Sequence, residues 1–339
     1  MYDFELVDYA KIDWSEYNQY SRKPVWTTKS WMDFVIADSH AVPMIFRIQK
    51  NGVFVGYAPF MIVKKLGGIL KIAGSPFRGW STCWMGIEVE NTDDKVPIIK
   101  EISKLLFTKY RCLYCEIVDR DIPMDVAMAS GFTIEPWGSL ELDINCTDEE
   151  LWKKFKTDCR NFIRQFERRG AVLSEAEPDD EFAEEYYEEL VDVFAKQGLV
   201  PSYSLQKVKN ILTNMKETGN LLCLRVRTPE DEPVASSIFF ADKHRFYFWG
   251  GASYRKQQHY RPNEYMLWYA IRYWRDKGIK KFDMVGDRPY KRKFGSEHVD
   301  FPMFKIGKYK FIVKGRDFSE KIYFKLMNFK YKHRKIESE

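Results

Sequence analysis

The residues best suited to chemistry lie in two basic loops in the second half of this 339-residue chain. The first loop, residues 252–261, follows an aromatic strand-like run at 245–249 and precedes a helical pattern that begins at Pro262. The first turn of a helix carries backbone N–H groups without helical partners, and these attract an anion or a polarised carbonyl. The loop therefore predicts a place to hold a phosphate-bearing donor or acceptor. The alternative is that its cationic side chains are merely solvated.

The second basic loop, residues 287–295, follows a strand-like run from Ile279 to Val285. Two cationic loops at the ends of neighbouring strands could converge on one ligand, which favours the binding interpretation for both. The sequence shows no Ser-His-Asp order, no cluster of metal ligands and no Walker loop, so covalent and metal-dependent routes have no support. Cys112 and Cys115 have CxxC spacing, but in a strand they would face opposite ways, so we expect no metal site.

Short motifs in this region resemble the second half of FemAB-like acyltransferases. They are the turn Gly250-Gly251-Ala252-Ser253-Tyr254, the helix start Pro262-Asn263-Glu264-Tyr265, the strand from Gly278 to Asp283 and the run Tyr290-Lys291-Arg292-Lys293-Phe294-Gly295. The spacing of Arg160, Asn161, Arg164 and Gly170 is similar to the first helix of the same second domains. The resemblance implies two copies of the GNAT N-acyltransferase fold in one chain. It also implies acyl or aminoacyl transfer to an envelope precursor such as an amino sugar, a lipid-linked glycan or a peptide stem.

The resemblance places a functionally important lysine at Lys291. A fixed cation there could neutralise the oxyanion of acyl transfer or hold a donor phosphate, and the alternative is one more exposed base in a run of three. Arg160 and Arg164 would share a helix face, either gripping a phosphate or forming a solvated basic face. Glu264 and Asp283 lie in the region, but no spacing singles out a general base. We predict Lys291 as catalytic and the following as substrate-binding, with no metal ligand: Trp31, Arg160, Arg164, Tyr254, Arg255, Asn263, Glu264 and Tyr290.

The predicted co-substrate is acyl-CoA or aminoacyl-tRNA, with no permanently bound cofactor. Residues 255–260 stand where ordinary GNAT enzymes have a glycine-containing loop for the coenzyme A pyrophosphate, and they contain no glycine. The basic surface suits tRNA, yet the long coiled-coil insertion of some tRNA-using relatives is missing. Some peptidoglycan-directed members have a substrate-binding lysine just after the tryptophan that Trp31 resembles. Residues 33–35 contain none, which argues against a nucleotide-linked muropeptide acceptor.

The order of elements and the resemblance together predict an α/β (α+β) protein of two tandem GNAT-like domains. Each should be a mixed, mostly antiparallel sheet flanked by helices. We expect the first domain at residues 1–147, the second at 148–312, and a basic amphipathic C-terminal helix at 313–339. Asn51-Gly52 between two alternating apolar runs is a strong hairpin signal, and a similar hairpin at 221–241 suggests duplication.

Composition excludes disorder, because 45% of the residues are hydrophobic and 30% are charged. No apolar run is long enough to span a bilayer, and the first residues lack the pattern of a signal peptide, so we expect a cytoplasmic protein. The net charge of +5 belongs to the end of the chain, since from Lys305 onward eleven Lys and Arg face four Asp and Glu. Residues 318–339 could contact anionic lipid on the inner membrane face or tRNA phosphates, or dock on their own domain. DNA is not an expected partner.

Two hypotheses follow. The first is an N-acyltransferase acting on an envelope precursor. The second is a non-catalytic module on a degenerate GNAT scaffold that binds RNA or a membrane surface through its basic tail.

Overall fold

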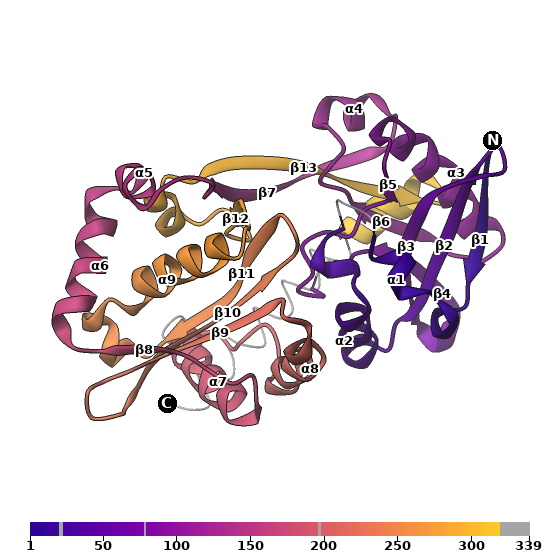
Figure 1. Cartoon of the computed structure of the whole chain (residues 1–339). Helices are drawn as coiled ribbons and strands as arrows, with labels where there is room; N and C mark the ends of the chain where they lie inside the picture. Colours follow the sequence, from indigo (N-terminus) through magenta and orange to yellow (C-terminus); the bar gives the residue numbers. More distant parts are fainter. Residues whose placement is uncertain (20–22, 78, 196–197, 319–339) are drawn as a thin grey trace. The chain divides into compact units, whose positions relative to one another are not determined.

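The computed structural model describes residues 1–19, 23–77, 79–195 and 198–318 (Figure 1). By its internal contacts the chain divides into two compact units. Among the described residues, unit 1 comprises 1–137 and 300–318, and unit 2 comprises 138–299. These bounds differ from the predicted ranges 1–147 and 148–312. Of the C-terminal helix predicted at 313–339, residues 313–318 belong to a helical stretch at 310–318, and the rest lie outside the described residues.

Unit 1 contains a mostly antiparallel sheet in the order β1-β2-β3-β4-β6-β13, with β5 paired to β3 and with β4 and β6 parallel. Its strands are β1 (Tyr2–Val7), β2 (Val42–Lys50), β3 (Val53–Lys65), β4 (Leu70–Ser75), β5 (Glu88–Val89), β6 (Tyr114–Val118) and the later part of β13 (Glu297–Gly307). Its helices are α1 (Trp14–Tyr17), α2 (Lys29–Ser39), α3 (Lys95–Thr108) and α4 (Met124–Ala129). The Asn51-Gly52 turn joins β2 and β3, as the sequence predicts.

The two faces of this sheet follow from the alternation along β3. Ala58, Phe60 and Ile62 point into a core that includes Ile99 and Ile102 of α3. Tyr57 points to the other face, where its ring lies 4.8 Å from that of Tyr17 in α1. Helices therefore cover both faces of the unit 1 sheet.

Unit 2 contains a second mostly antiparallel sheet, in the order β7-β12-β11-β10-β9-β8, with β11 and β12 parallel. Its strands are the later part of β7 (Thr133–Asp143), β8 (Val172–Glu175), β9 (Leu221–Arg227), β10 (Pro233–Ala241), β11 (Arg245–Ser253) and β12 (Lys281–Asp283). Its helices are α5 (Asp148–Lys154), α6 (Thr157–Arg169), α7 (Asp180–Ala195), α8 (Leu205–Met215) and α9 (Pro262–Asp276). The predicted fold class, a mostly antiparallel sheet flanked by helices in each half, is confirmed.

The core of unit 2 lies between its sheet and α9. Met266, Ile271 and Trp274 of α9 pack with strand residues and with residues of α5 and α6, while α7 and α8 lie on the opposite side of the sheet (Figure 1). Pro262 begins α9 and Gly278 follows its end, as predicted. Among the described residues, every helix is too short or too polar to cross a membrane.

Candidate functional site

In unit 2, the parallel strands β11 and β12 separate soon after they meet. They pair through three residues each, ending at Tyr247 opposite Asp283. Strand β12 stops there, while β11 continues to Ser253. The ends of β11 and β12 therefore diverge at the start of the two loops that the sequence marked as basic.

Strand β11 also carries a bulge close to this point. Its pairing with β10 shifts, because Phe239 stands opposite Phe248 whereas Ile238 stands opposite Gly250. Trp249 is thus one extra residue in β11. Bulges of this kind bend a strand and re-aim its groups, and they are frequent beside active sites.

Lys291 comes from a 3₁₀ turn, Pro289–Phe294, that follows β12. Its side chain is buried, and its Nζ donates to the carbonyl oxygens of Met284 and Val285, the latter at 2.8 Å. The ammonium lies 5.4 Å from the ring centroid of Phe248 in β11. Lys291 therefore places a buried positive charge where β11 and β12 separate.

The segment that Lys291 contacts has a constrained backbone. Val285 has a φ of 53°, a left-handed conformation that is rare for a β-branched residue. Its N–H donates to Asp283 Oδ1 at 2.8 Å, and Ser139 Oγ donates to the same oxygen at 2.5 Å while accepting from the Gly286 N–H at 3.1 Å. Asp283 and Lys291 thus hold the two sides of one tight turn, which gives Asp283 a positioning role.

The Phe294-Gly295 end of the same motif fastens the turn to the junction of α5 and α6. The ring of Phe294 lies 5.2 Å from that of Phe155, and the Lys156 N–H donates to the Lys293 carbonyl at 2.8 Å. Gly295 has a φ of 73°, and a Cβ at this position would meet the Lys154 carbonyl oxygen at 2.6 Å. The glycine is required by both its conformation and this close approach.

The two predicted arginines of α6 both contact Trp152 of α5. Arg160 donates to the Trp152 carbonyl at 3.1 Å and to Thr157 Oγ1 at 3.2 Å, and the guanidinium of Arg164 lies 5.3 Å from the Trp152 ring centroid. The structure therefore brings Arg160 and Arg164 together around Trp152. Their role in gripping a phosphate stays a prediction.

The loop before α9 contacts acidic residues of α7. The Arg255 N–H donates to Asp192 Oδ2 at 2.9 Å, and the Tyr254 hydroxyl donates to Glu188 Oε2 at 3.3 Å. Burial, followed by the nearby carboxylates, raises the pKa of Tyr254 to about 12, so its phenol keeps its proton at neutral pH. This loop presents a neutral phenol, and the N–H of Arg255 in it bonds to a carboxylate.

The remaining predicted residues fall in different surroundings. Glu264 is buried in the first turn of α9 and forms an ion pair with Lys293, while Asn263 and Tyr290 are exposed. Trp31 lies inside unit 1, fully buried, with its ring 4.4 Å from that of Trp26 and its Nε1 donating to Thr82 Oγ1 at 2.9 Å. Trp31 is part of the unit 1 core in this structure, so its contact with substrate stays a prediction.

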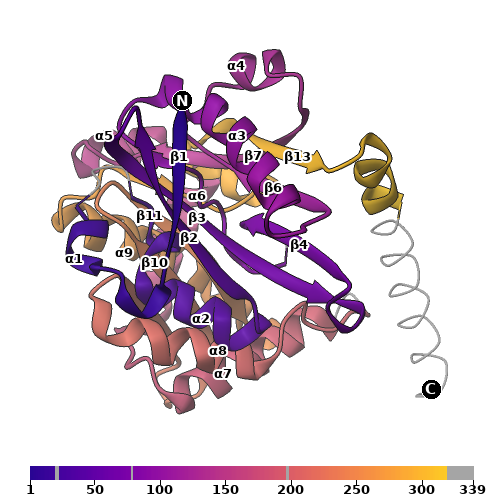
Figure 2. The same cartoon turned by 90° about the vertical axis from the view of Figure 1, so that its right-hand side faces the viewer.

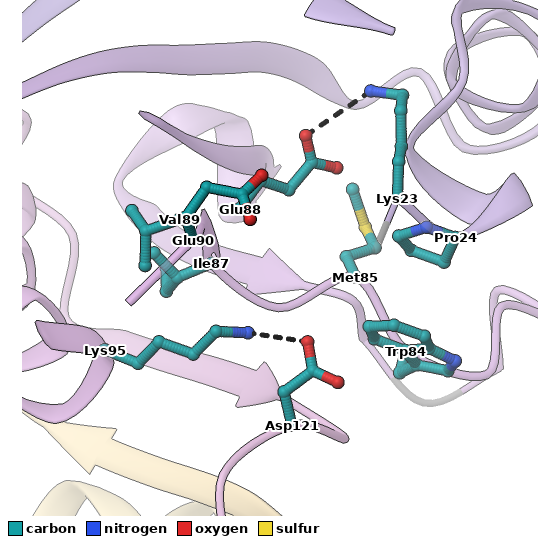
Figure 3. Close-up of a pocket in the computed structure, with 10 residues that line it drawn as sticks. All are labelled: Lys23, Pro24, Trp84, Met85, Ile87, Glu88, Val89, Glu90, Lys95 and Asp121. Atoms are coloured by element: carbon teal, nitrogen blue, oxygen red, sulfur yellow. Dashed lines mark hydrogen bonds and ion pairs between the residues drawn. The ribbon is translucent and has the colours of Figure 1, made fainter. Parts of the chain in front are cut away.

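Unit 1 contains a buried polar cluster that the sequence did not reveal. Figure 3 shows the Lys23 ammonium directed at Glu88, 3.4 Å away, and the Lys95 ammonium directed at Asp121, 3.0 Å away. Burial lowers the pKa of Lys23 to about 8 and raises the pKa of Glu88. The cavity between the two pairs has a volume of about 10 Å³, room for roughly one water molecule. It is too small for an acyl donor or acceptor, and scattered single charges gave no local pattern by which to predict it.

No group of three or more His, Cys, Asp or Glu side chains within the described ranges could hold a metal ion.

Comparison with known proteins adds a domain match and a set of similar folds. Residues 153–292 match the family described as an acetyltransferase (GNAT) domain. No curated protein matches the sequence. The crystal structure of FemX is similar with a TM-score of 0.71 at 13% identity, covering 88% of this chain and 96% of that one. A tandem GNAT protein from the clavulanic acid biosynthesis pathway is similar with a TM-score of 0.55 at 10% identity, covering 91% of this chain and 98% of that one.

A third similar structure is the C-terminal domain of a protein described as a lysylphosphatidylglycerol synthetase from Agrobacterium fabrum. Its TM-score is 0.53 at 11% identity, and the match covers 80% of this chain and 86% of that one. The likeness extends over nearly the whole of each relative and includes a protein with two GNAT units. The chain thus has the tandem GNAT fold, as its motifs predicted, and residues 153–292 match the acetyltransferase (GNAT) domain family.

Proposed function

We propose that this protein is a FemAB-like N-acyltransferase that moves an acyl or aminoacyl group onto an amine of a cell-envelope precursor. The acceptor would be an amino sugar, a lipid-linked glycan or a peptide stem. One observation carries the proposal: β11 and β12 diverge at a bulge beside the buried ammonium of Lys291. A shielded cation beside re-aimed backbone groups is suited to acyl transfer.

The reaction needs little beyond this arrangement. The acceptor nitrogen forms a bond to the donor carbonyl carbon, the donor's C–S or C–O bond breaks, and the proton lost by the acceptor amine ends on the departing thiolate or alkoxide, which leaves as a thiol or an alcohol. Negative charge develops on the carbonyl oxygen, and a cation in a site with little water stabilises it strongly. Lys291 is 5% exposed, so its charge acts with little screening. Its bonds to Met284 and Val285 fix its position before substrate binds.

The donor is acyl-CoA or aminoacyl-tRNA, and different observations support each. The GNAT domain match supports acyl-CoA. The loop 255–260 supports aminoacyl-tRNA, because it has no glycine for close approach of a pyrophosphate and the Arg255 N–H already bonds to Asp192. The likeness to a lysylphosphatidylglycerol synthetase domain favours an envelope component as acceptor.

The test is transfer of label from radiolabelled acyl-CoA or aminoacyl-tRNA to a panel of amino sugars, lipid-linked glycans and stem peptides. We expect label on one acceptor class. Lys291→Ala should lower kcat/KM about 100-fold or more, the usual loss when an oxyanion stabiliser is removed. Lys291→Arg should restore part of the activity, because it keeps the charge.

Lys243→Ala is the matched control. It removes one positive charge from an exposed position of the same unit, outside the two basic loops. We expect it to change kcat/KM less than about threefold, a surface effect. Circular dichroism and thermal melting must show that each variant is folded. A folded Lys291→Ala protein with full activity would contradict the role proposed for Lys291.

The non-catalytic RNA- or membrane-binding module is not favoured, since the chain carries a GNAT domain with the site described above. It would be supported by binding of RNA or vesicles together with no transfer from either donor. The tail on which that hypothesis rested, residues 318–339, lies outside the described residues except for Phe318.

A further inference from the structure

One end of the unit 1 sheet carries an exposed apolar residue among lysines. Strands β3 and β4 form a hairpin that pairs as far as Lys65 and Leu70. The turn contains Gly67 and Gly68, both with positive φ. Ile69 beside the turn is 85% exposed, and Lys64 and Lys65 are exposed too. An aliphatic side chain is here held out into solvent at the tip of a basic hairpin.

A second basic and apolar segment follows β13. Tyr309 and Phe311 are exposed, and their rings stack 5.6 Å apart with planes 5° from parallel. Lys308, Lys310 and Lys314 are exposed between and beside them. The same mixture of lysines and unburied apolar groups therefore occurs twice in unit 1.

Strand pairing places these two segments at the same end of the sheet. Ile72 of β4 stands opposite Tyr114 of β6, which in turn stands opposite Gly307 of β13. One step further out, the Leu113 N–H donates to the Lys71 carbonyl and the Lys308 N–H donates to the Leu113 carbonyl, each at 2.9 Å. In Figure 2, the hairpin between β3 and β4 and the helix after β13 both project on the right-hand side.

Lysines dominate the charge of this end. Neither segment, 60–75 nor 308–316, contains an aspartate or glutamate, and the next acidic residue, Asp317, pairs with Lys305. We call the surface formed by Lys64, Lys65, Ile69, Lys308, Lys310 and Phe311 the basic-apolar end. Single exposed apolar residues are ordinary, but several gathered within a basic surface at one end of a domain indicate an interaction site.

We propose that the basic-apolar end docks unit 1 on an anionic lipid surface. Apolar side chains enter the boundary of headgroups and acyl chains, and lysines around them are attracted to anionic headgroups. An RNA partner would use the stacked rings and the lysines, but it would leave the projecting Ile69 without a function. The proposal does not depend on the acyl-transfer reaction, and its test measures binding only.

The test is flotation of the full chain with vesicles of phosphatidylcholine alone and of phosphatidylcholine with phosphatidylglycerol. We expect binding to the anionic vesicles that weakens as salt is added. Lys64→Glu with Lys65→Glu should lower the partition coefficient about tenfold or more, from the usual contribution of each lysine near such a surface. Ile69→Asp and, separately, Phe311→Asp should also lower it.

Two controls are matched to these changes. Val53→Asp alters a 67% exposed aliphatic residue at the opposite end of the same strand β3. Lys243→Glu with Lys280→Glu reverses two exposed lysines of unit 2. Both controls should bind anionic vesicles as the natural sequence does. All the changes are at exposed positions, and thermal melting confirms folding.

Three outcomes would overturn the proposal. The first is equal binding to neutral and anionic vesicles, and the second is unchanged binding by the Lys64/Lys65 and Ile69 variants. The third is that the natural sequence binds tRNA but no vesicles and these variants lose the tRNA binding, which would assign the basic-apolar end to RNA. If a hairpin variant does not fold, Lys308→Glu with Lys310→Glu provides the same comparison from the other segment.

Discussion

Three consecutive basic residues of unit 2 lie in three different environments. Lys291 is buried and bonds to backbone carbonyls, Arg292 is exposed and bonds to Asp287 at 2.9 Å, and Lys293 forms an ion pair with Glu264. Lys291 is therefore not one more exposed base in a run of three. The local sequence shows three cations, whereas only the burial of one of them makes it suited to a developing oxyanion.

Glu189 is a buried carboxyl whose ionisation should affect stability. It is fully buried in α7, and burial raises the pKa of its carboxyl well above the ordinary value. The folded protein therefore keeps a proton that the unfolded chain releases above pH about 4.3. It follows that this carboxyl stabilises the fold fully at low pH, and that its contribution is lost as pH rises towards the folded-state pKa.

We predict that Glu189→Gln becomes more stable than the natural sequence as pH rises. The difference in unfolding free energy should grow by up to about 1.4 kcal/mol per pH unit between the unfolded-state and folded-state pKa values. Urea unfolding at pH 5, 6, 7 and 8 measures it. Glu184→Gln changes an exposed glutamate of the same helix, paired with Lys209, and should show no such growth. A difference in unfolding free energy that does not vary with pH would contradict the raised pKa of the buried Glu189 carboxyl.

Among the elements of unit 2, strand β11 lies very close to α7 at its bulge. The hydroxyls of Tyr186 in α7 and Tyr203 are hydrogen bonded at 2.6 Å, beneath the strand. A Cβ at Gly250 would lie 2.2 Å from the Tyr186 hydroxyl, so only a glycine permits this approach. The Gly250-Gly251 pair that served as a family motif thus has a packing reason.

Gly250→Ala should destabilise the protein by about 1–3 kcal/mol, the usual cost of overpacking. Tyr186→Phe in the same chain removes the clashing oxygen and should recover part of that loss. Thermal melting of the two single variants and the double variant gives the coupling between the positions. Additive effects would show that the close approach is not what requires glycine.

At the scale of the whole molecule, unit 1 is completed by residues from far along the chain. Residues Met303 to Gly307 of β13 pair with β6, and Phe304 is fully buried in the unit 1 core with its ring 5.9 Å from that of Phe132. Sequence periodicity had assigned this segment to the second domain, because it follows the second domain's elements directly. A pairing between strands so distant in sequence leaves no local signal.

Phe304→Ala should therefore destabilise unit 1 rather than unit 2. The expected loss is about 3–5 kcal/mol, as for other buried phenylalanines. Hydrogen exchange should become faster in β6 and stay slow in β10. Phe282→Ala removes an equally buried ring from the unit 2 core and should give the reverse pattern. The same acceleration in both units from either change would contradict the division into two compact units.

Much of the local structure could be predicted from sequence alone. The Asn51-Gly52 hairpin, the start of α9 at Pro262 and its stop before Gly278 follow from the sterics of a few neighbouring residues. The motif Tyr290–Gly295 carries the resemblance to FemAB-like proteins for a comparable reason, since Lys291, Phe294 and Gly295 each make a specific local contact.

The order of the residues was enough to predict the type and order of most elements, the resemblance to FemAB-like proteins and the residue at the centre of the proposed chemistry. Local sterics and hydrophobic spacing act over a few residues, so the order of residues along the chain is enough to predict their effects. The tertiary structure alone decided that β13 joins β6, that Lys291 is buried against β11, and that Lys64 and Lys308 lie at one end of one sheet. These facts depend on pairings between distant segments, whose free energy comes from burial and hydrogen bonds that exist only once the chain has folded.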